Sequence, residues 1–239
     1  MNAPYNMQLT EDCQNCPMRK DSFFCQFSNT ALKSFEAAKF TSSYPAGAVL
    51  FVEGQAPRGV YMVCRGRVKL TMTSIEGKTV IVRIANAGEL LGLQSSLSGD
   101  PFELTAETLE PCQINFVRRD DFVKMMRANH EACVNAMTQL SHFYRGACQQ
   151  IRYLALTHSA TEKLARFLLE AASKGQETKQ GVRFNLSLTH EEIAQVVGVS
   201  RETVTRSLTE LRNKSLISTS GPSVVIRNRQ GLEALVAAA

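Results

Sequence analysis

The stretch Leu188-Thr-His-Glu-Glu-Ile-Ala-Gln-Val-Val-Gly-Val-Ser-Arg-Glu-Thr-Val-Thr-Arg-Ser-Leu208 decides how the C-terminal part of this 239-residue chain folds. The apolar face of a first short helix consists of small and β-branched residues: Ile193, Ala194 and Val197. Gly198 is the turn residue after it, and Ser200 is placed to cap a second helix. The buried face of that second helix consists of apolar residues at helical spacing: Val204, Leu208 and Leu211. Such a pair of helices forms a helix-turn-helix, which presents its second helix to the major groove of DNA.

Four polar residues lie opposite this buried face, near the N-terminal end of the second helix: Arg201, Glu202, Thr205 and Arg206. An arginine in the major groove donates hydrogen bonds to guanine O6 and N7, and a glutamate accepts one from cytosine N4. Because DNA phosphates repel a carboxylate, Glu202 is predicted to read a base, and stabilising the helix N-terminus is compatible with that role. Thr189 precedes Glu191-Glu192, so it is predicted to cap the first helix and to lie on the same DNA-facing surface.

A two-stranded wing is predicted after the second helix, because the runs 216–219 and 224–226 flank the turn Ser220-Gly-Pro-Ser223. Basic residues near the helix and the wing are candidate phosphate partners, although each could instead be a solvated charge: Arg212, Lys214, Arg227 and Arg229. Upstream, residues 162–172 have the pattern of an amphipathic helix, which is followed by a polar loop after Gly175.

Short β-leaning runs broken by glycines occupy residues 28–127. The runs are rich in β-branched and aliphatic residues and cover four segments: 48–52, 60–64, 68–72 and 79–84. The glycines between them recur at spacings typical of hairpins, and Glu76-Gly77 is predicted to form a tight turn. Strands do not alternate with helices in this region, so a small antiparallel β-roll or barrel is expected rather than a parallel sheet.

From about Asn129 the hydrophobic period becomes helical, and a long helix is predicted over residues 128–158. Its apolar residues recur at alternating spacings of three and four, the pattern of a narrow a/d stripe that meets a second helix. The residues predicted to form the interface of a homodimer are Met137, Leu140, Tyr144, Ala147, Ile151 and Leu154. The alternative is a long helix that lies on its own domain.

The composition is that of a folded protein, since 44% hydrophobic and 21% charged residues exclude disordered and fibrous architectures. The net charge of +5 permits an anionic partner without requiring one. No apolar run is long enough to span a bilayer and the polar N-terminus lacks a signal-peptide core, so a cytoplasmic location is expected. The four histidines are scattered and no nucleophile elbow, P-loop or paired acidic motif is present, so the protein is not expected to be an enzyme.

A roll, a long pairing helix and a winged helix-turn-helix, in that order, resemble the CRP/FNR family of bacterial transcription regulators. The stretch Ser200–Arg206 is similar to the recognition helix of that family, and residues 76–92 are similar to part of its roll. The resemblance implies an α+β fold with a cyclic-nucleotide-binding-like jelly roll. It also implies a homodimer that binds a two-fold symmetric DNA site and works with RNA polymerase. Arg201 matches CRP proteins and Thr205 lies closer to the FNR serine, so the half-site stays open between TGTGA-like and TTGAT-like sequences.

Four parts of the chain are therefore expected: a cysteine-bearing arm (1–27), a β-roll sensor domain (28–127), a dimerisation helix (128–158) and a DNA-binding domain (159–239). CRP proteins bind cyclic AMP in the roll, and the matching positions here are Leu93, Phe102 and Glu103. An apolar residue replaces the ribose-binding carboxylate and Glu103 would repel the phosphate, so cyclic-nucleotide binding is not expected. Three arginines remain available to another anion, which keeps a small ligand as an alternative signal: Arg58, Arg65 and Arg67.

The cysteines of the arm indicate a different kind of sensor. Seven cysteines, an odd number, in a chain without a secretory signal argue against a disulfide framework. Three of them, Cys13, Cys16 and Cys25, lie within 13 residues of chain. Thiolates are soft ligands, and four of them suit either a tetrahedral zinc ion or an iron–sulfur cluster.

FNR proteins, which sense oxygen through a [4Fe–4S] cluster, take their fourth cysteine from a Cys-x-Ile-x-Phe-like strand. The similar stretch here is Cys112-Gln-Ile-Asn-Phe116, so the resemblance makes Cys112 the fourth ligand and implies DNA binding controlled by oxygen or redox state. A zinc site, and a metal-free site gated by thiol oxidation or a small ligand, are the alternatives. The remaining cysteines are interpreted as packing residues: Cys64, Cys133 and Cys148.

Overall fold

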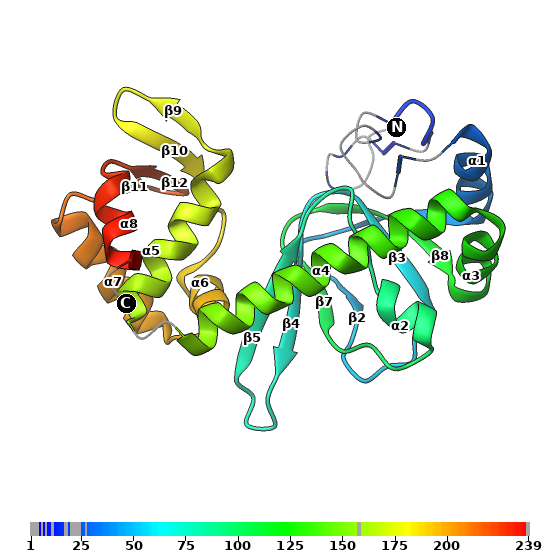
Figure 1. Cartoon of the computed structure of the whole chain (residues 1–239), viewed down its shortest axis with the longest axis horizontal. Helices are drawn as coiled ribbons and strands as arrows, with labels where there is room; N and C mark the ends of the chain where they lie inside the picture. Colours follow the sequence, from blue (N-terminus) through cyan, green and yellow to red (C-terminus); the bar gives the residue numbers. More distant parts are fainter. Residues whose placement is uncertain are drawn as a thin grey trace. The chain divides into compact units, whose positions relative to one another are not determined.

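The chain forms two compact units, Met1–Gly146 and Ala147–Ala239, and the boundary between them falls inside one long helix. A computed structural model describes the following residues: 5, 7, 9–10, 12–16, 19, 25–26, 28–156 and 159–237 (Figure 1). Side chains are described within these ranges except at residues 152–156, 174 and 237. Leu154 of the predicted dimer stripe therefore lies outside the described side chains.

The first unit is an antiparallel β-roll of two four-stranded sheets. One sheet, in the order β1-β8-β3-β6, consists of Lys39–Tyr44 (β1), Cys112–Arg118 (β8), Gly59–Arg65 (β3) and Leu90–Leu91 (β6). The other, in the order β2-β7-β4-β5, consists of Val49–Phe51 (β2), Thr105–Thr108 (β7), Val68–Thr73 (β4) and Thr79–Ala85 (β5). The helices around the sheets are Asn29–Ala38 (α1), Leu93–Ser98 (α2) and Arg119–Ala128 (α3). The predicted antiparallel roll is confirmed.

Two hydrophobic clusters stabilise the roll, and the strands β3 and β8 contribute to both of them. Cys112 and Ile114 of β8 belong to the cluster inside the roll, between the two sheets. Val117 of β8 belongs to the second cluster, which lies between the first sheet and the helices. On β3, Val63 points into the roll, and Met62 points to the helices. Successive side chains of a strand point to opposite faces of the sheet. The position of a residue in this alternation therefore decides which of the two clusters its side chain joins.

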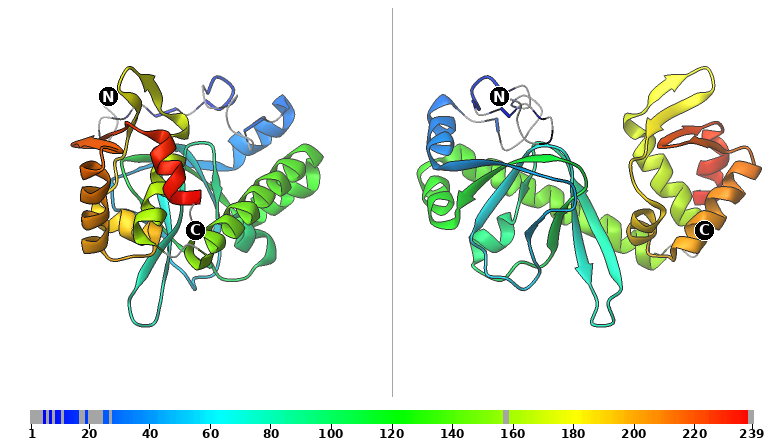
Figure 2. Two further views of the ribbon diagram at one scale, coloured as in Figure 1. Left: turned by 60° about the vertical axis from the view of Figure 1, so that its left-hand side comes forward. Right: turned by 180° about the vertical axis from the view of Figure 1, so that it is seen from behind.

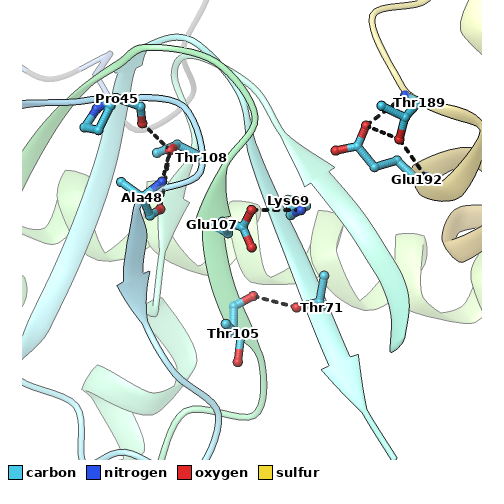
Figure 3. Close-up of polar contacts among 9 residues, drawn as sticks. All are labelled: Pro45, Ala48, Lys69, Thr71, Thr105, Glu107, Thr108, Thr189 and Glu192. Carbon is cyan, nitrogen blue, oxygen red and sulfur yellow. Dashed lines mark hydrogen bonds and ion pairs between the residues drawn. The ribbon is translucent and has the colours of Figure 1, made fainter. Parts of the chain in front are cut away.

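Polar contacts join the strands of the second sheet (Figure 3). The Lys69 ammonium lies 2.9 Å from the Glu107 carboxylate, which links β4 to β7. The Thr108 hydroxyl accepts a hydrogen bond from the Ala48 amide at 2.9 Å and donates to the Pro45 carbonyl at 2.6 Å. These bonds satisfy backbone groups of the loop between β1 and β2, where the sheet itself supplies no partner.

The β4–β5 hairpin extends beyond the rest of the roll (Figure 2). Its loop contains the predicted turn at Glu76-Gly77, and the Gly77 amide donates to the Ser74 carbonyl at 2.8 Å. Gly77 has a φ of 82°, which glycine adopts without strain. The predicted turn is confirmed.

The long helix α4 (His130–Leu156) packs along the first sheet with one of its faces (Figure 1). Ala136 is buried in the cluster between sheet and helices. The buried Gln139 amide donates to the Leu90 carbonyl of β6 at 2.7 Å. The Arg83 guanidinium lies 3.9 Å from the centre of the Phe143 ring, a cation–π contact between β5 and α4.

The second unit packs helices against a third four-stranded sheet, in the order β11-β12-β10-β9. Its strands are Gln176–Thr178 (β9), Gly181–Asn185 (β10), Ile217–Ser220 (β11) and Ser223–Ile226 (β12). Its helical segments are Ala160–Ala171 (α5), the 3₁₀ turn Ala172–Lys174 (η3), His190–Val197 (α6), Arg201–Asn213 (α7) and Arg229–Ala237 (α8). The β11–β12 hairpin is the predicted wing, so the winged helix-turn-helix is confirmed.

The polar loop predicted after Gly175 is wrong, because β9 and β10 form a hairpin there. Val182 and Phe184 are buried and alternate with the exposed Arg183 and Asn185, the pattern of a strand with one covered face. Strand β10 pairs with β12 of the wing, which makes the sheet wider than the predicted two strands.

Candidate DNA-binding surface and thiol pocket

Caps and a glycine turn fix the helix-turn-helix. The Thr189 hydroxyl accepts a hydrogen bond from the Glu192 amide at 3.2 Å, and the Thr189 amide donates to the Glu192 carboxylate at 2.8 Å (Figure 3). This reciprocal pair is a capping box, which satisfies two amides at the start of α6. Gly198 ends α6 with a φ of 70°. Ser200 then caps α7 by accepting from the Thr203 amide at 3.2 Å.

The structure brings the predicted DNA-reading residues together on the exposed face of α7: Arg201, Glu202, Thr205 and Arg206. The opposite face of α7 is buried in the core of the second unit. The Thr205 hydroxyl donates to the Arg201 carbonyl at 3.1 Å, and the His190 Nδ1 atom lies 3.0 Å from the same hydroxyl oxygen. Thr189, by contrast, uses its hydroxyl in the cap of α6.

Glu202 is a carboxylate at neutral pH. Its own backbone amide and the Ser200 hydroxyl hold the pKa of the Glu202 carboxyl below its ordinary value, because both donate to the charged form. The side chain is exposed. It therefore presents a charged acceptor near the N-terminal end of α7, beside the arginines.

The predicted phosphate partners fall into two groups. The Lys214 ammonium lies 2.7 Å from the Glu210 carboxylate, and the Arg229 guanidinium lies 2.8 Å from the Glu233 carboxylate. Both basic side chains therefore have an acidic partner one helical turn away. Arg212 and Arg227 are exposed, and the Arg212 guanidinium donates to the Thr209 hydroxyl at 2.8 Å and lies 3.5 Å from the Thr219 hydroxyl of the wing. An exposed basic side chain at the junction of α7 and the wing suits a phosphate contact better than a basic side chain that already has a carboxylate partner.

An open, shallow depression of about 440 Å³ lies on the exposed face of α7 and is lined by Thr205, Arg206, Thr209, Glu210, Asn213 and Lys214. Sequence reasoning missed Thr209, Glu210 and Asn213 as members of this surface. The available signal was their spacing, because each follows another lining residue by four positions and so lies on the same face of the helix.

Part of the predicted dimer stripe is exposed on α4 and part of it packs on the roll. Met137, Tyr144 and Ile151 are 55%, 75% and 66% exposed, and they follow each other at intervals of seven residues. Ala147 is also exposed, whereas Leu140 packs against the cluster between sheet and helices. Although α4 is long, no helix in the described part of the chain combines the length and apolar character needed to cross a membrane.

Four thiols line one small cavity between the N-terminal arm and β3: Cys13, Cys16, Cys25 and Cys64. Its other lining residues include Phe35, Met62 and Asn115, and its volume is about 20 Å³, enough for one water molecule. Burial raises the pKa of the Cys64 thiol, and the neighbouring thiols raise it further. Among the described residues, no group of three or more histidine, cysteine or acidic side chains is arranged to hold a metal ion.

Cys112 lies elsewhere. It is fully buried in the cluster inside the roll, and its thiol lies 3.1 Å from the Glu110 carbonyl and 3.4 Å from the Arg67 carbonyl. Burial raises the pKa of the Cys112 thiol to about 11. The structure thus brings together the three predicted cysteines of the arm, separates Cys112 from them and adds Cys64, which sequence reasoning assigned to packing.

The positions that match the cyclic-AMP site of CRP proteins are filled by side chains. Phe102 is 4% exposed and stacks on Phe51, with ring centres 4.0 Å apart. The ring also lies against Gly92, where a Cβ atom would approach it to 2.7 Å. Burial raises the pKa of the Glu103 carboxyl, which accepts a hydrogen bond from Gln94 at 2.5 Å.

A β-roll, a long helix and a winged helix-turn-helix with a polar exposed face define a class of protein, the DNA-binding regulator with an N-terminal sensor domain. Family models match both halves of this architecture. The cyclic nucleotide-binding domain matches residues 41–129, and the Crp-like helix-turn-helix domain matches residues 162–235. The chain belongs to the CRP/FNR family of DNA-binding transcription regulators.

Curated relatives and solved structures agree with this assignment. The chain is 27% identical over 185 residues to the cAMP-activated global transcriptional regulator CRP of Haemophilus influenzae, covering 77% of this chain and 82% of that protein. It is 26% identical over 190 residues to the CRP-like cAMP-activated global transcriptional regulator of Mycobacterium tuberculosis, covering 79% and 84%. The structure of FixK2 from Bradyrhizobium japonicum matches with a TM-score of 0.73 and 26% identity, over 84% of this chain and 98% of that one.

Proposed function

We propose that the protein is a dimeric, sequence-specific transcription regulator that reads a two-fold symmetric DNA site with α7 and works with RNA polymerase. The observation that carries this proposal is the row of exposed polar side chains on α7, opposite a face buried in the core. Arg201 can donate to guanine, and the ionised Glu202 can accept from cytosine N4. Both lie at the N-terminal end of the helix, the end that contacts base edges in helix-turn-helix proteins.

Dimerisation through α4 is the second part of the proposal. Met137, Tyr144 and Ile151 are large apolar side chains that the single chain leaves exposed at heptad spacing. A stripe of this kind is covered when two such helices pair along it. A pair of subunits presents two copies of α7, and the second half-site then binds at a high effective concentration.

Control of DNA binding by oxygen or redox state through a [4Fe–4S] cluster is the third part. Cys13, Cys16 and Cys25 would supply three of the four thiolates that such a cluster takes. The donor chemistry of these thiols fits the group, and the cavity that they line has a volume of about 20 Å³ without it. When bound, the cluster supplies reactivity toward oxygen.

The arm is positioned to pass a change in the thiol pocket to α4. The Gln26 carbonyl, one residue after Cys25, accepts a hydrogen bond from the Asn135 side chain of α4 at 3.2 Å. The Ser28 amide donates to the Glu131 carboxylate of the same helix at 2.9 Å. Movement of the arm would therefore change these two hydrogen bonds to the first turns of α4, the helix that carries the dimer stripe.

A second candidate is control by thiol oxidation without a metal, and the crowding of four thiols on one cavity favours it. Two neighbouring thiols would lose two electrons and two protons to form a disulfide, while hydrogen peroxide is reduced to two molecules of water. Acid-labile sulfide and visible absorbance in protein purified without air support the cluster, and their absence supports the thiol switch. The packing of Phe102 on Phe51 and Gly92 supports a signal other than cyclic AMP in either case.

Selection of binding sites from random duplex DNA, run with and without air, tests the proposed function. We expect enrichment of a two-fold symmetric motif in one of the two conditions and much weaker enrichment in the other. An Arg201→Ala variant selected in parallel should lose preference at one base in each half-site. Equal recovery of all sequences in both conditions would contradict the proposal.

A further inference from the structure

We infer that Cys64, and not Cys112, is the fourth thiol of the set that includes Cys13, Cys16 and Cys25. This inference rests on the proposed function, in which that set binds an iron–sulfur cluster. It differs from the ligand set implied by resemblance to FNR proteins, which matches Cys112. The geometry of β3, β8 and the arm carries it.

Cys64 projects from the face of β3 that lies toward the helices. Val60 and Met62 of this strand belong to the cluster on the helix side of the first sheet, and Cys64 packs against the same cluster. Cys64 also sits at a bulge, because Val63 pairs with Ile114 while Arg65 pairs with Gln113, so no residue of β8 opposes it. Bulges aim side chains out of the regular ladder, and this one aims a thiol at the arm.

Hydrogen bonds to Gln113 place the arm on one face of the first sheet. The Thr10 amide donates to the Gln113 side chain at 2.9 Å, and the Gln113 amide donates back to the Thr10 carbonyl at 2.7 Å. Further along, the Cys13 amide donates to the Glu36 carboxylate of α1 at 2.7 Å. These bonds hold the segment that carries Cys13 and Cys16 on the face of β8 from which Gln113 projects.

Cys112 precedes Gln113 on β8 and therefore points to the opposite face of the sheet. Its thiol is fully buried inside the roll, against the backbone of the turn before β4, where a Cβ atom on Gly66 would lie 2.5 Å from the sulfur. Bringing Cys112 to the arm would require a shift of β8 by one residue. That shift would also turn the polar Gln113 and Asn115 into the apolar interior of the roll and turn Ile114 out of it, so the hydrophobic pattern opposes it.

Iron and sulfide loading of single-cysteine variants tests the assignment. Wild type, Cys64→Ser, Cys112→Ala and the control Cys133→Ser are reconstituted without air using ferrous iron and sulfide, and iron and acid-labile sulfide are counted per chain. Cys133 is partly buried like Cys64 but does not line the cavity. We expect about four irons per chain in wild type, Cys112→Ala and Cys133→Ser, and at least a tenfold loss in Cys64→Ser after a chelator wash. Circular dichroism identifies the folded variants. If wild type binds iron, retention of iron by folded Cys64→Ser, or its loss from folded Cys112→Ala, overturns the assignment.

A second measurement keeps this inference separate from the proposed function. The metal-free wild-type protein is oxidised briefly with diamide, digested and examined by mass spectrometry for disulfide-linked peptides. We expect links between Cys64 and the cysteines of the arm, and links from Cys112 to the arm instead would overturn the inference. If wild type takes up no iron, the proposed cluster fails, and the diamide map still decides which thiol lies beside the arm.

Discussion

Replacing Ile151 with alanine should weaken dimerisation by about two orders of magnitude. Ile151 is 66% exposed in the single chain and follows Tyr144 on α4 by one heptad. The change removes three carbon atoms, each worth about 0.8 kcal/mol when buried, and the 66% exposure scales this to about 1.6 kcal/mol per subunit. Both subunits lose the contact, so the dimer loses about 3 kcal/mol, which is roughly one hundred- to two hundred-fold in its Kd.

Sedimentation of a dilution series measures this Kd for wild type, Ile151→Ala and the control Gln149→Ala. Gln149 is exposed and lies about 200° around the helix from Ile151, so its replacement leaves the stripe intact. Alanine favours the helix at both positions, which removes loss of helicity as a cause of dissociation. If Ile151→Ala dissociates at the same concentration as wild type, the exposed stripe is not the dimer interface.

Three further substitutions test the DNA-binding surface, the cap of α6 and the interior of the roll. Arg201→Ala should weaken binding to a selected DNA site by about 1–3 kcal/mol per half-site and relax one base preference, as competition at fixed salt measures. Thr189→Ala should lower the free energy of unfolding by about 1 kcal/mol in urea titrations, because it removes the capping box with Glu192. Phe102→Ala should lower it by about 3–5 kcal/mol, because this ring is 4% exposed and stacked on Phe51.

Conservative replacements serve as controls for these three. Arg201→Lys keeps the charge without the planar fork, so it should retain non-specific DNA binding and still lose the base preference. Thr189→Ser should restore the cap, and Phe102→Leu should recover part of the lost stability. Unchanged base preference in Arg201→Ala, or urea midpoints of Thr189→Ala and Phe102→Ala equal to wild type, would contradict the roles given to these side chains.

The helix-turn-helix and the hairpin turn at Gly77 were predictable from the sequence because their signals are local. Gly198 ends one helix and Ser200 begins the next, so the turn between them follows from residues that are adjacent in the chain. The β9–β10 hairpin was missed because only Val182 and Phe184 mark it among polar neighbours. Its stability comes from pairing with β12, about forty residues later, which no local pattern records.

The thiol pocket could be predicted only in part for the same reason. The spacing of Cys13, Cys16 and Cys25 identified three members, since they are close in sequence. Membership of the fourth depends on which face of β3 and β8 the arm covers, and that is decided by long-range bonds such as Thr10 to Gln113. The alternation of residues 60–64 places the side chains of Cys64 and Val60 on the same face of the strand. It does not show whether this face meets the arm or the interior of the roll.

Hydroxyl-radical footprinting of the protein on a selected DNA duplex tests the central claim most directly, because it records where two copies of α7 lie. We predict two protected patches related by two-fold symmetry, with centres about 10 base pairs apart, and weaker protection of both by Arg201→Ala at the same protein concentration. A single protected patch, or uniform weak protection along the duplex, would contradict it.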